Sequence, residues 1–158
     1  MAKQRENETS DRELVITRLL NAPRELVFEV WTDPKHVAQW WGPNGFTNTV
    51  HEMEVKPGGV WRLTMHGPDG VDFPNKIVFH KVFKPELLVY SHGDDKDPGQ
   101  FEVTVNFVAK GKKTELTMRS VFRTKEELDH VVKNYGAREG MTQHMNRLEA
   151  YLADFEEM

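Results

Sequence analysis

The central part of the chain alternates apolar and polar residues with a period of two. The pattern runs through most of residues 46–66 and 101–120, and polar turns at 57–59, 67–70 and 110–113 interrupt it. A period of two indicates β-strands that bury only one face, which is typical of an antiparallel sheet. Such a sheet needs a second layer of structure to cover its apolar face.

An amphipathic helix at the C-terminal end is the one predicted element long enough to form that layer. Its apolar side chains recur at steps of four and three, at Met141, Met145, Leu148, Leu152 and Phe155. We therefore predict an α+β fold in which a curved antiparallel sheet of about six to seven strands wraps around this helix.

Two short helices are predicted between the first strand and the rest of the sheet. Pro23 and Pro34 each suit the first turn of a helix, and Asp33 can cap the second one. The predicted helices span residues 23–31 and 34–41. We expect this pair to lie over the space where the sheet and the long helix diverge, and to act as its lid.

Two adjacent tryptophans, Trp40 and Trp41, end the second of these helices. Neighbouring residues differ by about 100° around a helix, so the two rings cannot point in the same direction. Both still share a side with Val37, which lies three and four residues earlier. We predict that at least one of these rings forms the apolar underside of the lid.

Composition narrows the class of protein. The chain has 158 residues, a formal net charge of -4 and no cysteine. The weak negative charge argues against general binding to nucleic acid or to anionic membranes, and the lack of cysteine excludes disulfides, thiolate nucleophiles and Cys-type zinc sites. No segment approaches the ~18 apolar residues of a membrane helix. We expect a cytoplasmic protein with a flexible tail (residues 1–12) and one domain (residues 13–158).

Four segments resemble a known protein family. They are WTDPKHVAQWWGP (31–43), EVKPGGVWRLTMHGPDG (54–70), KPELLVY (84–90) and YGAREGMTQHMNRLEAYL (135–152). In this order they resemble the helix-grip (START-like, SRPBCC) superfamily, which includes the birch-pollen-allergen fold. Within it they resemble the single-domain bacterial homologues of the heat-shock-protein-90 ATPase activator. The resemblance implies a helix-grip fold, but it does not fix an activity, because the superfamily contains binders, enzymes and partner-binding domains.

The inward-facing positions of this fold are the candidate wall of a ligand cavity. Methionine is frequent among them, and its flexible side chain adapts to variable contents. A simply filled core is the alternative interpretation for the apolar members. The predicted set is Trp40, Trp41, His51, Met53, Trp61, Leu63, Met65, His80, Tyr90, Val105, Phe107, Met118, Met141, His144, Met145 and Leu148.

Four histidines are predicted near the apolar side of the sheet and helix. His51, His80 and His92 share the two-residue period of apolar neighbours, and His144 borders the helical apolar stripe. If two or three of them converge, they supply polar contacts in an apolar cavity. The alternative is that each is a hydrogen-bonded or partly exposed histidine. We assign no catalytic residue, metal ligand or cofactor, since no nucleophile, phosphate-binding or metal-ligand motif is present.

Three functions remain in competition at this level. The first is binding of a small hydrophobic or lipid-like ligand between sheet and helix. The second is a protein-interaction module that serves a chaperone, which the family resemblance implies. The third is a cyclase or hydrolase-like enzyme that uses cavity histidines. We expect a monomer or a homodimer, the latter through Ile77, Phe79 and Phe83 if these residues point outward from the sheet.

Overall fold

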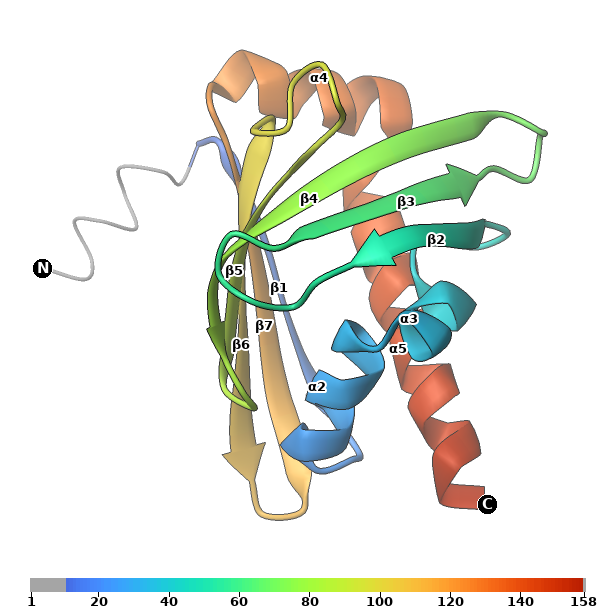
Figure 1. Cartoon of the computed structure of the whole chain (residues 1–158), viewed down its shortest axis with the longest axis vertical. Coiled ribbons are helices and arrows are strands. Elements are labelled where there is room, and N and C mark those ends of the chain that lie inside the picture. Colours follow the sequence, from blue (N-terminus) through green and yellow to red (C-terminus); the bar gives the residue numbers. More distant parts are fainter. Residues whose placement is uncertain (1–10, 158) are drawn as a thin grey trace, which may run out of the picture.

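A computed structural model describes residues 11–157 and shows an antiparallel sheet wrapped around one long helix (Figure 1). The seven strands of the sheet follow the order β1-β7-β6-β5-β4-β3-β2. The α+β helix-grip fold predicted from the sequence is confirmed. The elements along the chain are β1 (Glu13–Leu20), α2 (Arg24–Thr32), α3 (Pro34–Trp40), β2 (Thr47–Met53), β3 (Val60–His66), β4 (Asp72–Phe83), β5 (Leu87–Gly93), β6 (Phe101–Lys110), β7 (Lys113–Phe122), α4 (Lys125–Tyr135) and α5 (Ala137–Glu157).

The predicted tail, residues 1–12, lies almost entirely outside the described residues. The boundary of the domain at residue 13 therefore stays a prediction.

The neighbouring strands β6 and β7 show the predicted alternation most clearly. Val103, Val105 and Phe107 of β6 are buried, as are Leu116 and Met118 of β7. Val105 pairs directly with Met118 across the ladder, so the two inward faces are continuous. One face of the sheet is thus apolar and covered, as the sequence predicts.

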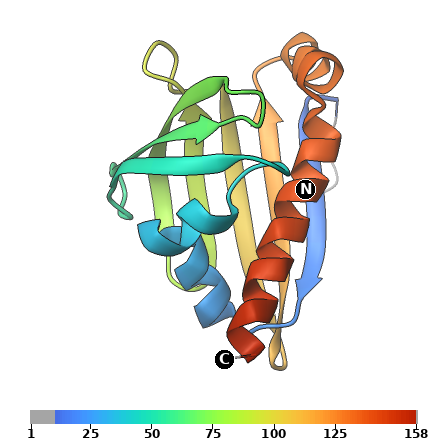
Figure 2. The ribbon, with the colours of Figure 1, turned by 90° about the vertical axis from the view of Figure 1, so that its right-hand side faces the viewer.

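Helix α5 covers this apolar face along the length of the sheet, and α2 and α3 lie beside it on the same side (Figure 2). Met145, Leu148 and Leu152 of α5 are buried in the main hydrophobic cluster. Helix α5 begins directly after Gly136, whose left-handed backbone (φ 61°) ends α4. A left-handed backbone favours glycine, because glycine has no Cβ. The break between α4 and α5 therefore follows from the residue type at position 136.

Helix α3 begins at Pro34 as the sequence predicts but ends one residue early, and α2 begins one residue later than predicted, at Arg24. The Asp33 side chain accepts a hydrogen bond from the backbone N–H of Lys35 at 2.9 Å, and Pro34 is the first helical residue. Helix α3 ends at Trp40, and Trp41 is already extended (φ -61°, ψ 137°). Because the backbone changes direction between them, the side chains of the two tryptophans point in different directions.

A β-bulge in β2 makes the predicted orientation of His51 wrong. The register of β2 against β3 shifts between Val50 and Glu52. The extra residue reverses the alternation at that point, so Val50 and Met53 both pack against the core. His51 is exposed, and its Nε2 lies 2.9 Å from the hydroxyl of Thr64.

A second bulge in β4 makes the predicted orientation of His80 wrong in the same way. The register of β4 against β5 shifts between Phe79 and Lys81. Ile77 and Phe79 are fully buried, whereas His80 is exposed and hydrogen-bonded to Ser91. Ile77 and Phe79 therefore cannot belong to the dimer surface that the sequence suggested, since neither side chain points outward.

Candidate functional site

An open pocket of about 230 Å³ lies between the sheet and the N-terminal turns of α5. Enclosed apolar cavities of roughly 150 Å³ bind benzene, so the volume of this pocket accommodates a substituted aromatic ring with one side towards solvent. Its wall comes from β1, β3, β5, β6 and β7, from the segment after α3, and from the junction of α4 and α5. The lining residues are Leu14, Trp41, Gly42, Pro43, Met65, His92, Phe101, Met118, Ser120, Phe122, Tyr135, Ala137, Gly140, Met141 and His144.

The structure divides the predicted cavity residues between this pocket and the core. Those that line the pocket are Trp41, Met65, Met118, Met141 and His144. Those that are buried in the core away from the pocket are Trp40, Trp61, Leu63, Tyr90, Val105, Phe107, Met145 and Leu148. Met53 is partly buried against the core, and His51 and His80 face away from it. The filled-core interpretation thus applies to most of the predicted set.

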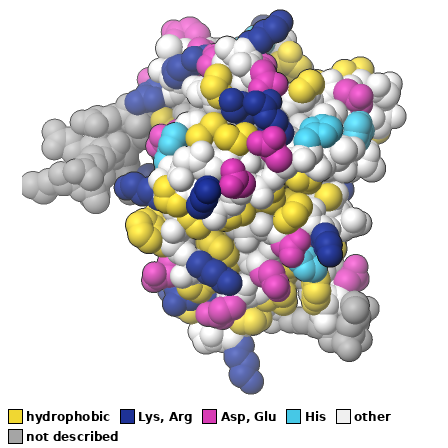
Figure 3. Space-filling view, viewed as in Figure 1, with side chains coloured by type: hydrophobic (Ala, Val, Ile, Leu, Met, Phe, Trp, Pro, Cys, Tyr) yellow, Lys and Arg dark blue, Asp and Glu magenta, His cyan; other side chains and the backbone are white. Residues whose placement is uncertain are grey.

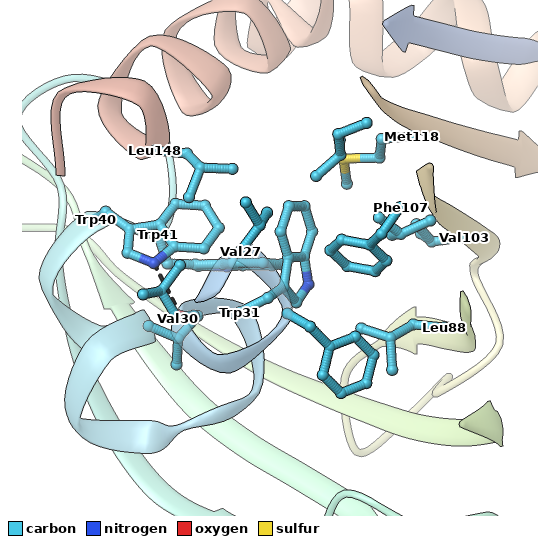
Figure 4. Packing of buried hydrophobic residues seen from close by; sticks show 14 of the residues in the cluster. Val27, Val30, Trp31, Trp40, Trp41, Leu88, Val103, Phe107, Met118 and Leu148 are labelled. Atoms are coloured by element: carbon cyan, nitrogen blue, oxygen red, sulfur yellow. Dashed lines mark hydrogen bonds between the residues drawn. The ribbon is translucent and has the colours of Figure 1, made fainter. Parts of the chain in front are cut away.

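The two adjacent tryptophans have different places in this arrangement. Trp40 lies in the core, where its indole N–H donates a hydrogen bond to the carbonyl of Val30 at 3.0 Å (Figure 4). Trp41 is just as buried, but its ring borders the pocket and packs edge-to-face against Trp61 and His144 at centroid distances of 4.8 and 4.5 Å. Trp41 is therefore a fixed part of the pocket wall.

Arg147 of α5 holds the segment that carries Trp41. Its Nη1 donates hydrogen bonds to the backbone carbonyls of Trp41, Gly42 and Pro43 at 2.9, 3.0 and 2.8 Å, and its Nη2 donates to that of Phe46 at 3.0 Å. The planar guanidinium suits several carbonyls at once because its donors form a rigid fork. No motif in the sequence indicates this contact, since its acceptors are backbone atoms.

His144 ties the same segment to α5 from inside the pocket. The backbone N–H of Gly42 donates a 3.0 Å hydrogen bond to Nδ1 of His144, so the ring proton sits on Nε2. Burial, followed by the charge of Arg147, lowers the pKa of His144 to about 3 and keeps the ring neutral. Among the described residues, Nε2 has no hydrogen-bond partner.

His92 is the second histidine in the pocket wall. The period of β5 places it inward, but it is absent from the predicted cavity set above. Its Nε2 lies 2.8 Å from the side-chain oxygen of Asn75, and burial lowers the pKa of His92 to about 4. The ring also packs against Phe101 at a centroid distance of 4.7 Å. The pair of cavity histidines is thus His92 and His144, without His51 and His80.

The pocket wall offers polar contacts but no charge. None of its lining residues is Asp, Glu, Lys or Arg, and Ser120 contributes a buried hydroxyl-bearing side chain. Within residues 11–157, no group of three or more potential ligands could hold a metal ion. The enzymatic alternative loses support, because two of the four candidate histidines, His51 and His80, lie outside the pocket.

An open groove of about 400 Å³ adjoins the pocket beside α4. Its polar rim includes Arg123, which bonds Asp97 at 2.8 Å and Glu127 at 3.2 Å. Phe101 and Phe122 line both the groove and the pocket, and their rings stack at a centroid distance of 4.8 Å. The stacked pair thus separates the pocket from the groove.

Comparison with models of known protein families gives one match that covers most of the chain. The family described as "Activator of Hsp90 ATPase homolog 1-like protein" matches residues 21–153. The chain belongs to this family. The match includes both short helices, the sheet from β2 onward and most of α5. The resemblance recognised in the four sequence segments is confirmed.

Solved structures show the same fold in other members of this structural class. A crystal structure of a protein from Mycobacterium smegmatis has a TM-score of 0.83 at 24% identity and covers 93% of this chain and 94% of that one. An NMR structure from Arthrobacter aurescens has a TM-score of 0.83 at 24% identity, with coverages of 92% and 88%. An AHSA1-like protein from Aeromonas hydrophila has a TM-score of 0.69 at 21% identity, with coverages of 87% and 92%.

These identities support a shared fold and leave the activity open. No curated protein matches the chain. Within the described residues, none of the helices combines the length and the apolar character needed to cross a bilayer.

Proposed function

We propose that this protein binds a small hydrophobic molecule in the pocket between the sheet and α5. The observation that carries the proposal is the uncharged wall of aromatic and methionine side chains around about 230 Å³. Ligand pockets are typically concave and mostly apolar, with a few polar groups that orient the ligand. Met65, Met118 and Met141 supply flexible walls that adapt to the shape of an occupant.

The size of the pocket limits its affinity. A ligand gains about 25 cal/mol for each Å² of apolar surface that it buries, and loses several kcal/mol of translational and rotational freedom. A substituted single ring therefore binds in the micromolar to millimolar range. We expect single-ring aromatic compounds to bind, and ligands with several fused rings to be excluded unless the methionines move.

A filled pocket is the direct test of this proposal. Ala137 lines the pocket, whereas Ala150 is exposed on the same helix, so Ala137→Leu and Ala150→Leu form a matched pair. In ¹⁵N NMR titrations with toluene, we expect the first variant to bind at least about ten-fold more weakly than the parent protein, and the second to bind equally well. Equal affinity in all three proteins places the binding elsewhere and contradicts the proposal.

Family membership favours a second candidate, a role as a chaperone cofactor. The family is described by its likeness to an activator of the Hsp90 ATPase. On the face shown in Figure 3, however, hydrophobic side chains are mixed with charged ones, as on an ordinary protein surface. The test is the ATPase rate of the Hsp90 of the same cell, with and without this protein. An unchanged rate together with no binding at high micromolar concentration removes the candidate.

The cytoplasm remains our proposed location for the binding activity. Cell fractionation with an antibody against the protein tests this assignment.

A further inference from the structure

We infer that the natural ligand is an uncharged, mostly apolar molecule that donates a hydrogen bond, from a hydroxyl or an N–H group, to Nδ1 of His92. This inference rests on the proposed function and specifies the class of ligand. It combines three observations: the proton position on His92, the unoccupied hydrogen-bonding capacity of its second nitrogen, and the absence of charge in the pocket wall.

The hydrogen bonds around Asn75 fix the proton on His92. The side-chain nitrogen of Asn75 donates a 2.8 Å hydrogen bond to the carbonyl of Phe73, which can only accept. The orientation of the amide is therefore set, and its oxygen faces Nε2 of His92 at 2.8 Å. That oxygen also can only accept, so Nε2 of His92 carries the proton. Because the ring is neutral, Nδ1 carries a lone pair.

We place the lone pair on Nδ1 at the pocket, because His92 lines the pocket and Nδ1 is not among the buried polar atoms that lack a partner. His92 is half-buried and lines the pocket, and the centroid of its ring lies 4.7 Å from that of Phe101 and 6.5 Å from that of Trp41. Within residues 11–157, Nδ1 makes no hydrogen bond. An acceptor at an apolar wall is costly to cover without a donor, so a ligand that supplies one gains affinity over an isostere that does not.

The wall excludes charged ligands. It contains no acidic or basic side chain, and burial holds both of its histidines neutral near pH 7. A carboxylate or an ammonium group against this wall would lose part of its hydration without gaining a countercharge, which is unfavourable. Arg147 lies close to His144, but its guanidinium is already bonded to backbone carbonyls.

Ser120 is the other polar group at which a ligand hydroxyl could bind, because the unpartnered Nε2 of His144 is buried. It lies on β7, which is separated from β5 and His92 by one intervening strand. Strands are spaced about 4.8 Å apart, so the backbones of the two residues are roughly 10 Å or more from each other. One hydroxyl on a single-ring ligand therefore contacts either residue, and mutagenesis can separate the two sites.

The experiment compares para-cresol with para-xylene, which differ only by a hydroxyl in place of a methyl group. Affinities are measured by ¹⁵N NMR titration in the parent protein and in His92→Phe, Ser120→Ala and His80→Phe. The phenylalanine at position 92 retains a ring but has no acceptor. His80 is exposed and outside the pocket, so its variant is the control for the same substitution.

We expect the parent protein and His80→Phe to bind para-cresol about three- to ten-fold more tightly than para-xylene. His92→Phe should reverse this order, because the hydrocarbon is the more hydrophobic of the two. Each comparison is made within one variant, so a general loss of affinity does not obscure it. A preference for para-cresol that persists in His92→Phe overturns the inference, and its loss in Ser120→Ala would assign the hydroxyl to Ser120. Equal binding of both compounds to the parent protein overturns the inference as well.

Failure of the proposed function gives a different result. If neither compound binds the parent protein up to its solubility limit, the pocket is not a binding site and both conclusions fall. If both bind without preference, ligand binding stands and only the hydrogen bond to His92 is wrong. ¹⁵N spectra of the imidazole nitrogens test the premise directly, since Nδ1 of His92 should be unprotonated and should shift when para-cresol binds.

Discussion

The two ends of α5 cover the sheet in different ways. Around its C-terminal part, Leu148 and Leu152 belong to one hydrophobic cluster with Trp31 and Trp40, and large rings fill the space (Figure 4). We call this the filled half, and it includes α5 from residue 145 onward. Residues 137–144 of α5 and their partners form the open half, where the pocket lies.

Side-chain size explains the difference. The open half of α5 presents Ala137 and Gly140 to the pocket, and a Cβ at Gly140 would lie 3.4 Å from Pro43. Helix α5 approaches the segment after α3 closely there, yet the small residues leave space beside it. In the filled half, α2 and α3 insert aromatic rings instead. A single helix thus combines a rigid core with a pocket, and each half can be altered separately.

The largest expected effect is in the filled half, at Trp31. Its ring lies edge-to-face with Trp40, Trp41 and Phe107 at centroid distances of 5.1, 5.7 and 6.0 Å. Trp31→Ala should lower the free energy of unfolding by about 3–5 kcal/mol in urea denaturation, because it leaves a large cavity. The exposed Phe83 provides the control, and Phe83→Ala should change stability by less than about 0.5 kcal/mol.

A matched pair on α5 compares the two halves directly. Leu148→Ala should lower the unfolding free energy by about 2–4 kcal/mol, since Leu148 is fully buried. Met141 is only partly buried at the pocket, so Met141→Ala should lower it by about 1 kcal/mol and admit larger aromatic ligands. Equal losses in the two variants would show that the halves are packed alike.

Acid should destabilise the open half. Burial lowers the pKa of His144 to about 3 and that of His92 to about 4, below the ordinary value of 6.5. Below pH 6.5 the unfolded chain binds protons that the folded protein does not, so stability falls as the pH falls towards 4. Each histidine should remove about 2 kcal/mol of stability between pH 7 and pH 5.

Urea denaturation at several pH values measures this slope, and His144→Gln should reduce it by the share of one histidine. The glutamine oxygen retains an acceptor for the N–H of Gly42. A slope that is unchanged in this variant would show that His144 does not titrate as described.

A smaller effect than those at Trp31 and Leu148 is expected at Arg147, whose hydrogen bonds hold the pocket segment. Arg147→Met should lower the unfolding free energy by about 1–2 kcal/mol, because backbone carbonyls at a part-buried site lose their donor. Hydrogen exchange should increase selectively at Gly42 and Asn44, whose N–H groups bond to α5. Arg147→Lys should restore little of the lost stability or of the protection from exchange, since an ammonium group cannot replace the planar fork of guanidinium donors. Uniform exchange across the molecule would contradict the local role.

The sequence predicts this fold well because its strongest signals are local. The alternation in β6 and β7 and the cap at Asp33 each depend on residues within a few positions. Such patterns predict which side chains face the core as long as the strand contains no bulge. The bulges at His51 and His80 each add one residue, which reverses the facing of every later side chain in the strand. The local sequence pattern does not indicate where a bulge occurs.

By itself, the sequence determined the order of the elements, the apolar face of the sheet and the helix that covers it. Hydrophobic periodicity encodes these features directly, and the family resemblance agrees with them. Only the tertiary structure decided which of the inward residues border space and which are packed core. Trp40 and Trp41 are equally apolar, and the turn of the backbone between them separates their roles.

The tertiary structure also decided the chemistry of the pocket. The proton on His144 follows from a hydrogen bond to Gly42, 102 residues away, and that on His92 from Asn75 on a neighbouring strand. The guanidinium of Arg147 binds backbone carbonyls, and every residue type has a backbone carbonyl, so the sequence does not indicate this contact. These contacts depend on distances between elements far apart in the chain, and such distances are set by packing.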